Sequence, residues 1–161
     1  MSSFLSKLFG KKKTETVAEK EEIIPAKTIE LVQVSFEAVK PIAATAADIF
    51  YSKLFELDPK LKPMFPAADK DKMKEQGNKL MTMLSAAVAG LSNIEALIPV
   101  LQDLGKRHIA YRVEKSHYDT VGAALIGTLA VGLGDDFTPE VKQAWTDVYG
   151  LMASVMIEAA Y

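Results

Sequence analysis

One histidine of this chain has a spacing that suggests chemistry. The stretch LQDLGKRHIAYRVEKSHYDTVG contains both histidines, and the chain has no cysteine. Leu97, Leu101 and Leu104 recur at helical spacing, and His108 continues the series, so a helix carries this histidine on its apolar, inward-facing stripe. An inward imidazole either bonds a carbonyl or a water in the core or binds a metal as a neutral ligand. The stretch by itself leaves both interpretations open.

Composition limits that chemistry. A chain of 161 residues that is 49% hydrophobic and 25% charged suits one globular domain with a single core. The lack of cysteine excludes disulfides, thiolate ligands, iron–sulfur clusters and covalent c-type haem attachment, so any metal is held by nitrogen or oxygen. The formal net charge of -2 gives no basic stripe, and we expect no nucleic-acid partner.

Neither a membrane span nor a secretion signal is expected. The apolar runs are interrupted before the ~18 residues that a span requires. No small-residue cleavage site follows a long hydrophobic stretch near the N-terminus. The sequence therefore predicts a cytoplasmic protein.

Residues 1–27 differ from the rest of the chain. Apolar residues lie on one side of a short helix and lysines flank them: Phe4, Leu5, Leu8 and Phe9, with Lys7, Lys11, Lys12 and Lys13. This basic amphipathic pattern suits peripheral contact of residues 1–13 with the inner membrane surface or with a partner, whereas the alternative is a disordered tail. We expect a flexible extension over residues 1–27 and a separate domain over residues 28–161.

The elements that must position His108 are all helical. No segment after Thr28 alternates at period two, so the sequence predicts an all-α domain. Helices are expected at residues 28–39, 41–57, 69–89, 92–108, 115–131 and 138–161, with a short helix near 58–66. Thr28, Asp58 and Thr138 are expected to cap helix starts, and Pro99 is expected to divide or kink its helix. Gly132-x-Gly134 is interpreted as a helix end, because a dinucleotide loop needs a third glycine.

Four segments, taken in order and at compatible spacing, resemble globins, most closely bacterial single-domain haemoglobins and neuroglobin-like proteins. They are DIFYSKLFELDPKLKPMF, EQGNKLM, LIPVLQDLGKRHIAYRVEKSHYDTVGAAL and FTPEVKQAWTDVYGLMA. The resemblance covers about residues 28–161. It implies the globin fold, seven or eight helices around a haem, and the cofactor haem b (iron protoporphyrin IX) bound without a covalent link.

The resemblance also implies roles on the proximal side of the haem. His108 would be the metal ligand, because globin iron takes one neutral imidazole. Val113 and Tyr118 would contact the cofactor on the same side. His117 follows nine residues after His108 and is interpreted as a helix-start or surface residue.

On the distal side the resemblance implies Tyr51 and Gln76 as two donors to a bound diatomic gas. Bound dioxygen carries partial negative charge, which two buried donors stabilise. Leu80 would wall the ligand pocket, Phe65 would pack on the porphyrin, and Lys79 would swing towards a propionate. Without a haem, the alternatives are ordinary core for the two apolar residues and solvent contact for the polar ones.

One position departs from the flavohaemoglobin-type pattern, in which a glutamate and a tyrosine together bond the proximal histidine. Tyr118 matches that tyrosine, but the glutamate position falls on Ala160. Glu158 lies about 200° round the helix from the expected direction. A weaker electron push on the iron favours reversible binding over peroxidase-like bond cleavage.

Three functions follow from the resemblance. The first is a protein that transports, stores or senses dioxygen, nitric oxide or carbon monoxide. The second is a nitric oxide dioxygenase, which would need a separate reductase because no reductase segment follows the globin-like part. The third is a haem-free helical module, which would leave polar core residues without partners. The sequence does not indicate an oligomeric state.

Overall fold

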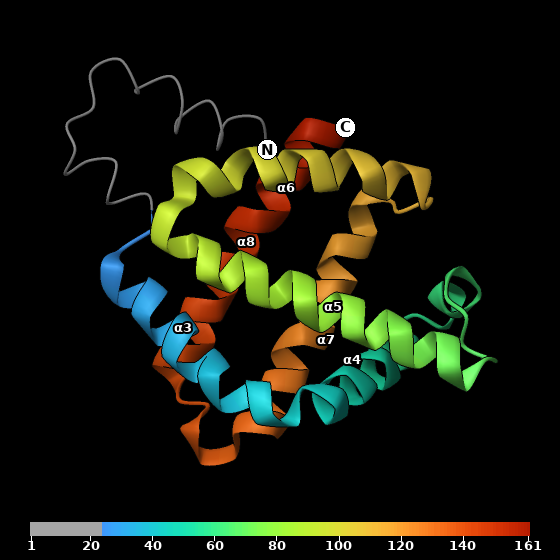
Figure 1. The fold of residues 1–161 in the computed structure, drawn as a ribbon, viewed down its shortest axis with the longest axis horizontal. Coiled ribbons are helices and arrows are strands. Elements are labelled where there is room, and N and C mark those ends of the chain that lie inside the picture. The colour runs from blue at the N-terminus through green and yellow to red at the C-terminus, as the bar shows by residue number, and fades with distance from the viewer. Residues whose placement is uncertain (1–23) are drawn as a thin grey trace.

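The computed structural model describes residues 24–161, and within them the chain is helical, without strands. The described part contains six α-helices and four short 3₁₀-helices (Figure 1). The α-helices are α3 (Ala26–Val39), α4 (Ala43–Leu57), α5 (Lys70–Gly90), α6 (Ile94–Ala110), α7 (Lys115–Leu133) and α8 (Pro139–Ala160). The 3₁₀-helices are η1 (Lys40–Ile42), η2 (Pro59–Met64), η3 (Leu91–Asn93) and η4 (Gly134–Asp136). The predicted all-α class is confirmed.

The helices cross one another in two layers. In Figure 1, α5 and α6 cross in front of α7 and α8, while α3 and α4 close one end. The largest contacts join α6 to α8, α4 to α7 and α3 to α8. The helices α6 and α4 are therefore held by packing on α8 and α7, whereas α5 packs on α4, α3 and α6.

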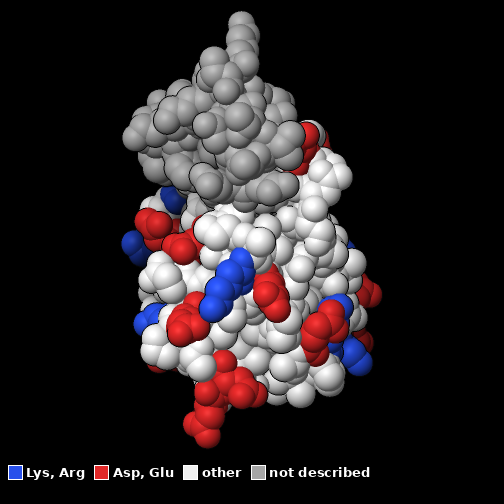
Figure 2. Space-filling model, turned by 90° about the vertical axis from the view of Figure 1, so that its left-hand side faces the viewer, with Lys and Arg blue, Asp and Glu red and all other residues white. Residues whose placement is uncertain are grey.

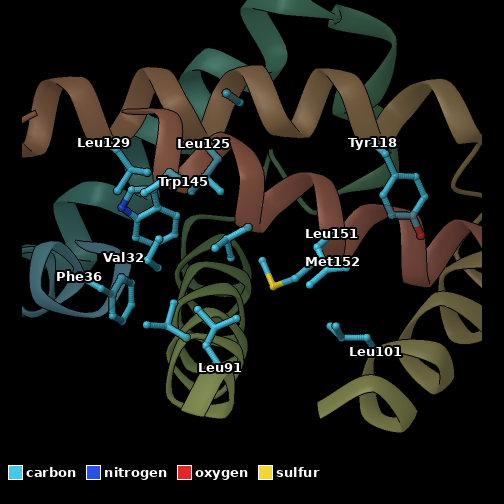
Figure 3. Packing of buried hydrophobic residues seen from close by; sticks show 14 of the residues in the cluster. Val32, Phe36, Leu91, Leu101, Tyr118, Leu125, Leu129, Trp145, Leu151 and Met152 are labelled. Atoms are coloured by element: carbon cyan, nitrogen blue, oxygen red, sulfur yellow. The ribbon is translucent and has the colours of Figure 1, made fainter. Parts of the chain in front are cut away.

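The centre of the core lies on α8. Trp145, Val148 and Val155 of that helix have no exposed surface, and the ring of Trp145 lies 6.1 Å from that of Phe36 on α3. The indole Nε1 donates to Ser35 Oγ at 2.8 Å, so α3 is fastened to α8 by a hydrogen bond as well as by apolar contact. Figure 3 shows Phe36 and Trp145 at one end of the core, with Tyr118 at the other.

Side-chain caps begin several of the helices. Asp58 accepts from the backbone N–H of Lys60, Asp69 accepts from those of Asp71 and Lys72, and Thr138 accepts from that of Val141. The caps predicted at Asp58 and Thr138 are thus confirmed. Asn93, next to the predicted start of a helix at residue 92, accepts from Ala96 N–H at 3.4 Å.

The predicted cap at Thr28 is wrong. The helix α3 begins at Ala26, and Pro25 occupies the N-cap position without a side-chain hydrogen bond. The Pro25 carbonyl accepts from Ile29 N–H at 3.2 Å. A proline suits this place because its missing N–H would have no intrahelical partner there.

The expected division at Pro99 is not observed. The helix α6 runs from Ile94 to Ala110 without interruption. Pro99 lies near the N-terminal end of α6 and is exposed, and its ring costs one hydrogen bond of the helical ladder. The neighbouring side chains of Leu97, Ile98 and Leu101 are buried, and this packing holds the helix together.

The end of α7 agrees with the interpretation of its glycines. The helix ends at Leu133, and Gly134 follows with a φ of 55°. This backbone conformation favours glycine, since a Cβ atom would be strained there. The pair Gly132 and Gly134 therefore belongs to a helix terminus.

One stretch, Lys70–Ala110, includes an 18-residue window of mean hydropathy 1.6, which meets the length and composition of a membrane span. No membrane span was predicted because the apolar runs are interrupted by polar residues. A mean hydropathy over 18 residues can stay high when single polar residues interrupt such a run. This is weak evidence, because a core helix passes the same test. The stretch consists of α5 and α6, which turn at η3 (Figure 1).

Figure 2 shows one face of the molecule, on which lysines and arginines are interspersed with aspartates and glutamates. No large area of a single sign appears among the described residues on this face. Residues 1–23 lie outside the described part, so the amphipathic pattern of residues 1–13 stays a prediction. The helix α3 begins at Ala26 and Ile24 is buried in the core, so the packed part of the chain begins before the predicted boundary at residue 28.

Candidate functional site

The side chain of His108 is fixed by the helix that carries it. His108 lies on α6, and its Nδ1 is 2.7 Å from the carbonyl oxygen of Leu104, one turn earlier. A carbonyl oxygen only accepts, so Nδ1 carries the proton and donates. The neutral ring then has its lone pair on Nε2, the atom that is free to bind a metal. Leu104 is a functional residue that the sequence reasoning missed, although its separation of four residues from His108 is a usable signal.

His108 is half-buried, and its surroundings favour the uncharged ring. Burial lowers the pKa of His108 below its usual value, the hydrogen bond to the Leu104 carbonyl opposes that shift, and the charge of Arg107 adds to it. A neutral imidazole is the form that binds metals. Within residues 24–161, no group of three histidine, cysteine, aspartate or glutamate side chains is placed to hold a metal ion. His108 would therefore supply a metal ion with a single nitrogen ligand.

Two tyrosines flank the imidazole of His108. The ring of Tyr111 lies 5.7 Å from it, and that of Tyr118 on α7 lies 6.4 Å from it at an angle of 32°. The hydroxyl of Tyr118 is buried and has no hydrogen-bond partner among the described residues. The Tyr118 hydroxyl therefore makes no hydrogen bond with His108. It makes none with the carboxylate of Glu158 either. Tyr111 was not predicted, although it lies one helical turn after His108.

The loop after α6 is tied to the last helix. Val113 N–H donates to the carbonyl of His108 at 3.1 Å, and the Val113 carbonyl accepts from the hydroxyl of Tyr161. Tyr149 Oη donates to the carbonyl of Tyr118 at 2.5 Å. Burial, together with the nearby Tyr161, raises the pKa of Tyr118 to about 12. Tyrosines thus make the contacts that join α7, α8 and this loop beside the imidazole.

A second cluster forms around Tyr51 on α4. Burial raises the pKa of Tyr51, and a side-chain hydrogen bond with Gln76 on α5 opposes that rise. Both side chains have an N–H or O–H group that can donate to a further polar group. The structure brings these two predicted residues together.

Phe65 belongs to the same cluster. Its ring lies 5.3 Å from that of Tyr51 and 5.6 Å from that of Phe55, in tilted or edge-on arrangements. Phe50 packs edge-on against Tyr51 at 5.1 Å. These rings immobilise the tyrosine, because each holds one side of the phenol. Phe50 and Phe55 were not predicted.

Leu80 and Lys79 follow Gln76 on α5. Leu80 is half-buried and packs against the core, whereas Lys79 is exposed. Neither has a contact in the structure that tests its predicted role towards a haem. Both roles stay predictions.

His117 is a helix-start residue, as predicted. It occupies the third position of α7, and its Nδ1 accepts from the backbone N–H of Glu114 at 3.0 Å. The Glu114 side chain in turn accepts from the backbone N–H of His117, which completes a capping box. Its ring nitrogen is thereby used within the chain, in contrast to Nε2 of His108.

The apolar side of α5 is incompletely covered by protein. Of its 21 residues, only Gly77 and Val88 are buried, while Met73, Leu80 and Leu84 are partly exposed although they pack against the core. A helix whose apolar stripe is left partly open needs a further apolar surface against it. A porphyrin supplies such a surface, so the residues present fit a haem.

A single neutral imidazole, an incompletely covered apolar helix and a neighbouring tyrosine–glutamine pair together fit an all-α haem protein. A family model described as Globin matches residues 48–156. The chain belongs to the globin family, and that family binds haem.

Three relatives show how far the similarity extends. The chain is 30% identical to a flavohemoprotein of Bacillus subtilis (strain 168) over 131 residues, which are 81% of this chain and 33% of that protein. It is 30% identical to neuroglobin-1 of Oncorhynchus mykiss and 28% identical to neuroglobin of Dissostichus mawsoni, each over 84% of this chain and 91% of the relative. The chain thus spans about a third of the flavohemoprotein and nearly all of each neuroglobin.

Proposed function

We propose that this globin binds dioxygen, nitric oxide or carbon monoxide reversibly at haem b, for transport, storage or sensing. The observation that carries the proposal is the bond from His108 Nδ1 to the Leu104 carbonyl, which directs the free Nε2 away from its own helix. Bound haem supplies an iron with one coordination position open to a diatomic gas. His108 holds the metal as its sole protein ligand.

Tyr51 and Gln76 are the donors to the gas. Burial raises the pKa of Tyr51, so its hydroxyl keeps its proton at neutral pH and above. The Tyr51 hydroxyl and the Gln76 amide both have a proton to donate to a ligand that carries partial negative charge. Each donor stabilises such a ligand by about 1–2 kcal/mol. Phe65 and the other rings around Tyr51 keep the donor in place when no ligand is bound.

The proximal side favours binding over bond cleavage. His108 Nδ1–H donates a hydrogen bond to the neutral carbonyl of Leu104, and no carboxylate accepts a hydrogen bond from the hydroxyl of Tyr118. A carboxylate partner makes an imidazole a stronger donor to the metal, and a carbonyl does so less. The arrangement therefore suits a haem that releases its ligand unchanged.

Nitric oxide dioxygenation with a separate reductase is the alternative. It is favoured by the 30% identity to a flavohemoprotein and by the tyrosine–glutamine pair. The two functions share a ligand site and differ in turnover. Nitric oxide consumption that continues over many cycles with an added reductase supports the alternative, and a single stoichiometric reaction supports reversible binding.

The first experiment is an absorption spectrum of the purified chain. A Soret band that shifts on reduction and again on addition of carbon monoxide supports the proposed function. A chain that takes up no haem after reconstitution contradicts it.

The second experiment compares dioxygen dissociation rates by stopped flow. Tyr51→Phe should raise the rate about tenfold, since a lost donor of ~1.4 kcal/mol corresponds to that factor. Tyr111→Phe makes the same change beside His108, on the other cluster, and should leave the rate within about twofold of the native chain. An unchanged rate in Tyr51→Phe refutes its role as a donor.

A further inference from the structure

The helix that carries the candidate metal ligand packs directly on the backbone of another helix at Gly105. This residue is buried on α6, where that helix packs on α8. A Cβ atom added at Gly105 would lie 2.4 Å from the carbonyl oxygen of Met156, 2.8 Å from its Cα and 2.9 Å from its carbonyl carbon. All three atoms are backbone, so no side-chain rotation relieves the contact.

Two other helical glycines in the described part of the chain meet side chains instead. A Cβ atom at Gly122 would meet the ring of Tyr149 at 2.7 Å, and one at Gly90 would meet the side chain of Leu97 at 2.9 Å. Such side chains can move aside, whereas two backbones must separate. The Gly105 contact therefore limits how closely α6 and α8 can approach when residue 105 carries a side chain.

The same residue shares a peptide group with the acceptor of His108. The carbonyl that receives the Nδ1 proton belongs to Leu104 and is bonded to the nitrogen of Gly105. A peptide group is planar and rigid, so a displacement at Gly105 moves this oxygen with it. His108 follows three residues later on the same helix.

We propose that Gly105 is a positioning residue for His108. Because Gly105 has no side chain, the backbone of α6 packs directly against the backbone of α8 at Met156. This contact fixes the position of the Leu104 carbonyl, which in turn orients the imidazole of His108. The inference rests on the proposed haem function and goes beyond it, because it assigns the alignment of the proximal ligand to one interhelix contact.

The test compares Gly105→Ala with Gly150→Ala in the haem-loaded chain. Gly150 is an exposed glycine of α8 with nothing within 4 Å of an added Cβ atom, so its substitution adds the same methyl group without a contact. Two readouts report on the ligand itself: the iron–histidine stretching frequency of the ferrous unliganded chain, from resonance Raman spectra, and the Nδ1 proton shift of His108 in the diamagnetic carbon monoxide form, from NMR.

In Gly105→Ala we expect a shifted iron–histidine frequency, a changed Nδ1 proton shift and a haem dissociation rate that is roughly ten- to a hundredfold higher, the usual effect of disturbing a group that orients a metal ligand. Gly150→Ala should match the native chain in all three. A stretching frequency and proton shift that stay native in Gly105→Ala overturn the positioning role while the proposed function stands. A native chain that binds no haem overturns both.

A second variant covers the case in which Gly105→Ala does not fold. Met156→Ala removes a buried side chain at the same crossing but keeps the backbone that Gly105 contacts. If the backbone contact orients His108, this variant should lose stability and retain the native stretching frequency. A shifted frequency in Met156→Ala would mean that side-chain packing sets the ligand position, which overturns the proposal.

Discussion

Replacing Tyr118 with phenylalanine should stabilise this protein, although tyrosine is the larger residue. The hydroxyl of Tyr118 is buried without a hydrogen-bond partner among the described residues. An unsatisfied buried hydroxyl costs about 1–3 kcal/mol, and removing it forfeits a few contacts of one oxygen atom. We therefore expect the free energy of unfolding of Tyr118→Phe to rise by about 1 kcal/mol at neutral pH.

The neighbouring tyrosine provides a control of opposite sign. Tyr149 Oη donates to the backbone carbonyl of Tyr118 at 2.5 Å, so Tyr149→Phe removes the same atom and loses a hydrogen bond. This variant should be less stable than the native chain by about 1 kcal/mol. Urea unfolding followed by circular dichroism measures both changes, with all chains at equal haem saturation because a bound ligand adds to apparent stability.

The same substitution should change the response to alkaline pH. The pKa of Tyr118 is raised from 10.0 to about 12 by burial first and by Tyr161 second. Between these values the folded chain keeps a proton that the unfolded chain has lost, so the stabilising contribution is complete below pH 10 and is lost as the pH rises through 12. Solvent screening reduces the effect below the ~1.4 kcal/mol per pKa unit that a fully buried group would give.

Tyr118→Phe should therefore lose less stability than the native chain over this alkaline window. The pKa of Tyr149 is raised first by burial and then by the nearby Tyr118 and Asp119. Because Tyr118→Phe removes one of these charges, it should also reduce the loss of stability that Tyr149 causes at alkaline pH. The reasoning is refuted if Tyr118→Phe is destabilised at neutral pH by as much as Tyr149→Phe, because the Tyr118 hydroxyl would then have a favourable partner.

Three further changes test other parts of the molecule. His108→Ala should lose the haem or bind it weakly in absorption titrations, whereas His117→Ala should bind it normally and lose only its helix cap; equal affinity in both would refute the role of His108. Arg112 has a φ of 65°, and Arg112→Gly should raise the free energy of unfolding in urea by up to about 1 kcal/mol; a lower value would contradict the idea that backbone strain at residue 112 costs stability. We propose that residues 1–13 hold a cytoplasmic protein at the inner membrane surface. The whole chain should then sediment with anionic vesicles at low salt, and residues 24–161 alone, which keep α3 and the buried Ile24, should not. Equal sedimentation of the two would refute this.

Local sequence signals predicted the helix starts that depend on one side chain. Asp58 and Thr138 cap helices because their own oxygens reach a backbone N–H two or three residues later. Pro99 failed as a break for the opposite reason. Its local cost is offset by the burial of Leu97 and Leu101, and that burial depends on helices distant in sequence.

The candidate site was predictable in its residue types but less so in its bonds. The resemblance paired Tyr51 with Gln76, and in the structure Gln76 lies close enough to Tyr51 to lower its pKa against the effect of burial. Ala160, in place of a glutamate, predicted that Tyr118 would lack a carboxylate partner, and its hydroxyl has none. The contact between the backbones of Gly105 and Met156 could not be predicted from the sequence, because a glycine in a helix does not reveal which backbone it approaches.

His108 shows why the spacing alone could not decide its role. The apolar stripe left two interpretations, a core histidine bonded to a carbonyl or a metal ligand. In the structure the imidazole makes the first interaction through Nδ1, which bonds Leu104, and for that reason is prepared for the second through Nε2. The carbonyl bond selects the tautomer, and the tautomer determines which nitrogen has a lone pair. The two interpretations therefore describe the two nitrogens of one ring, and the first is the condition for the second.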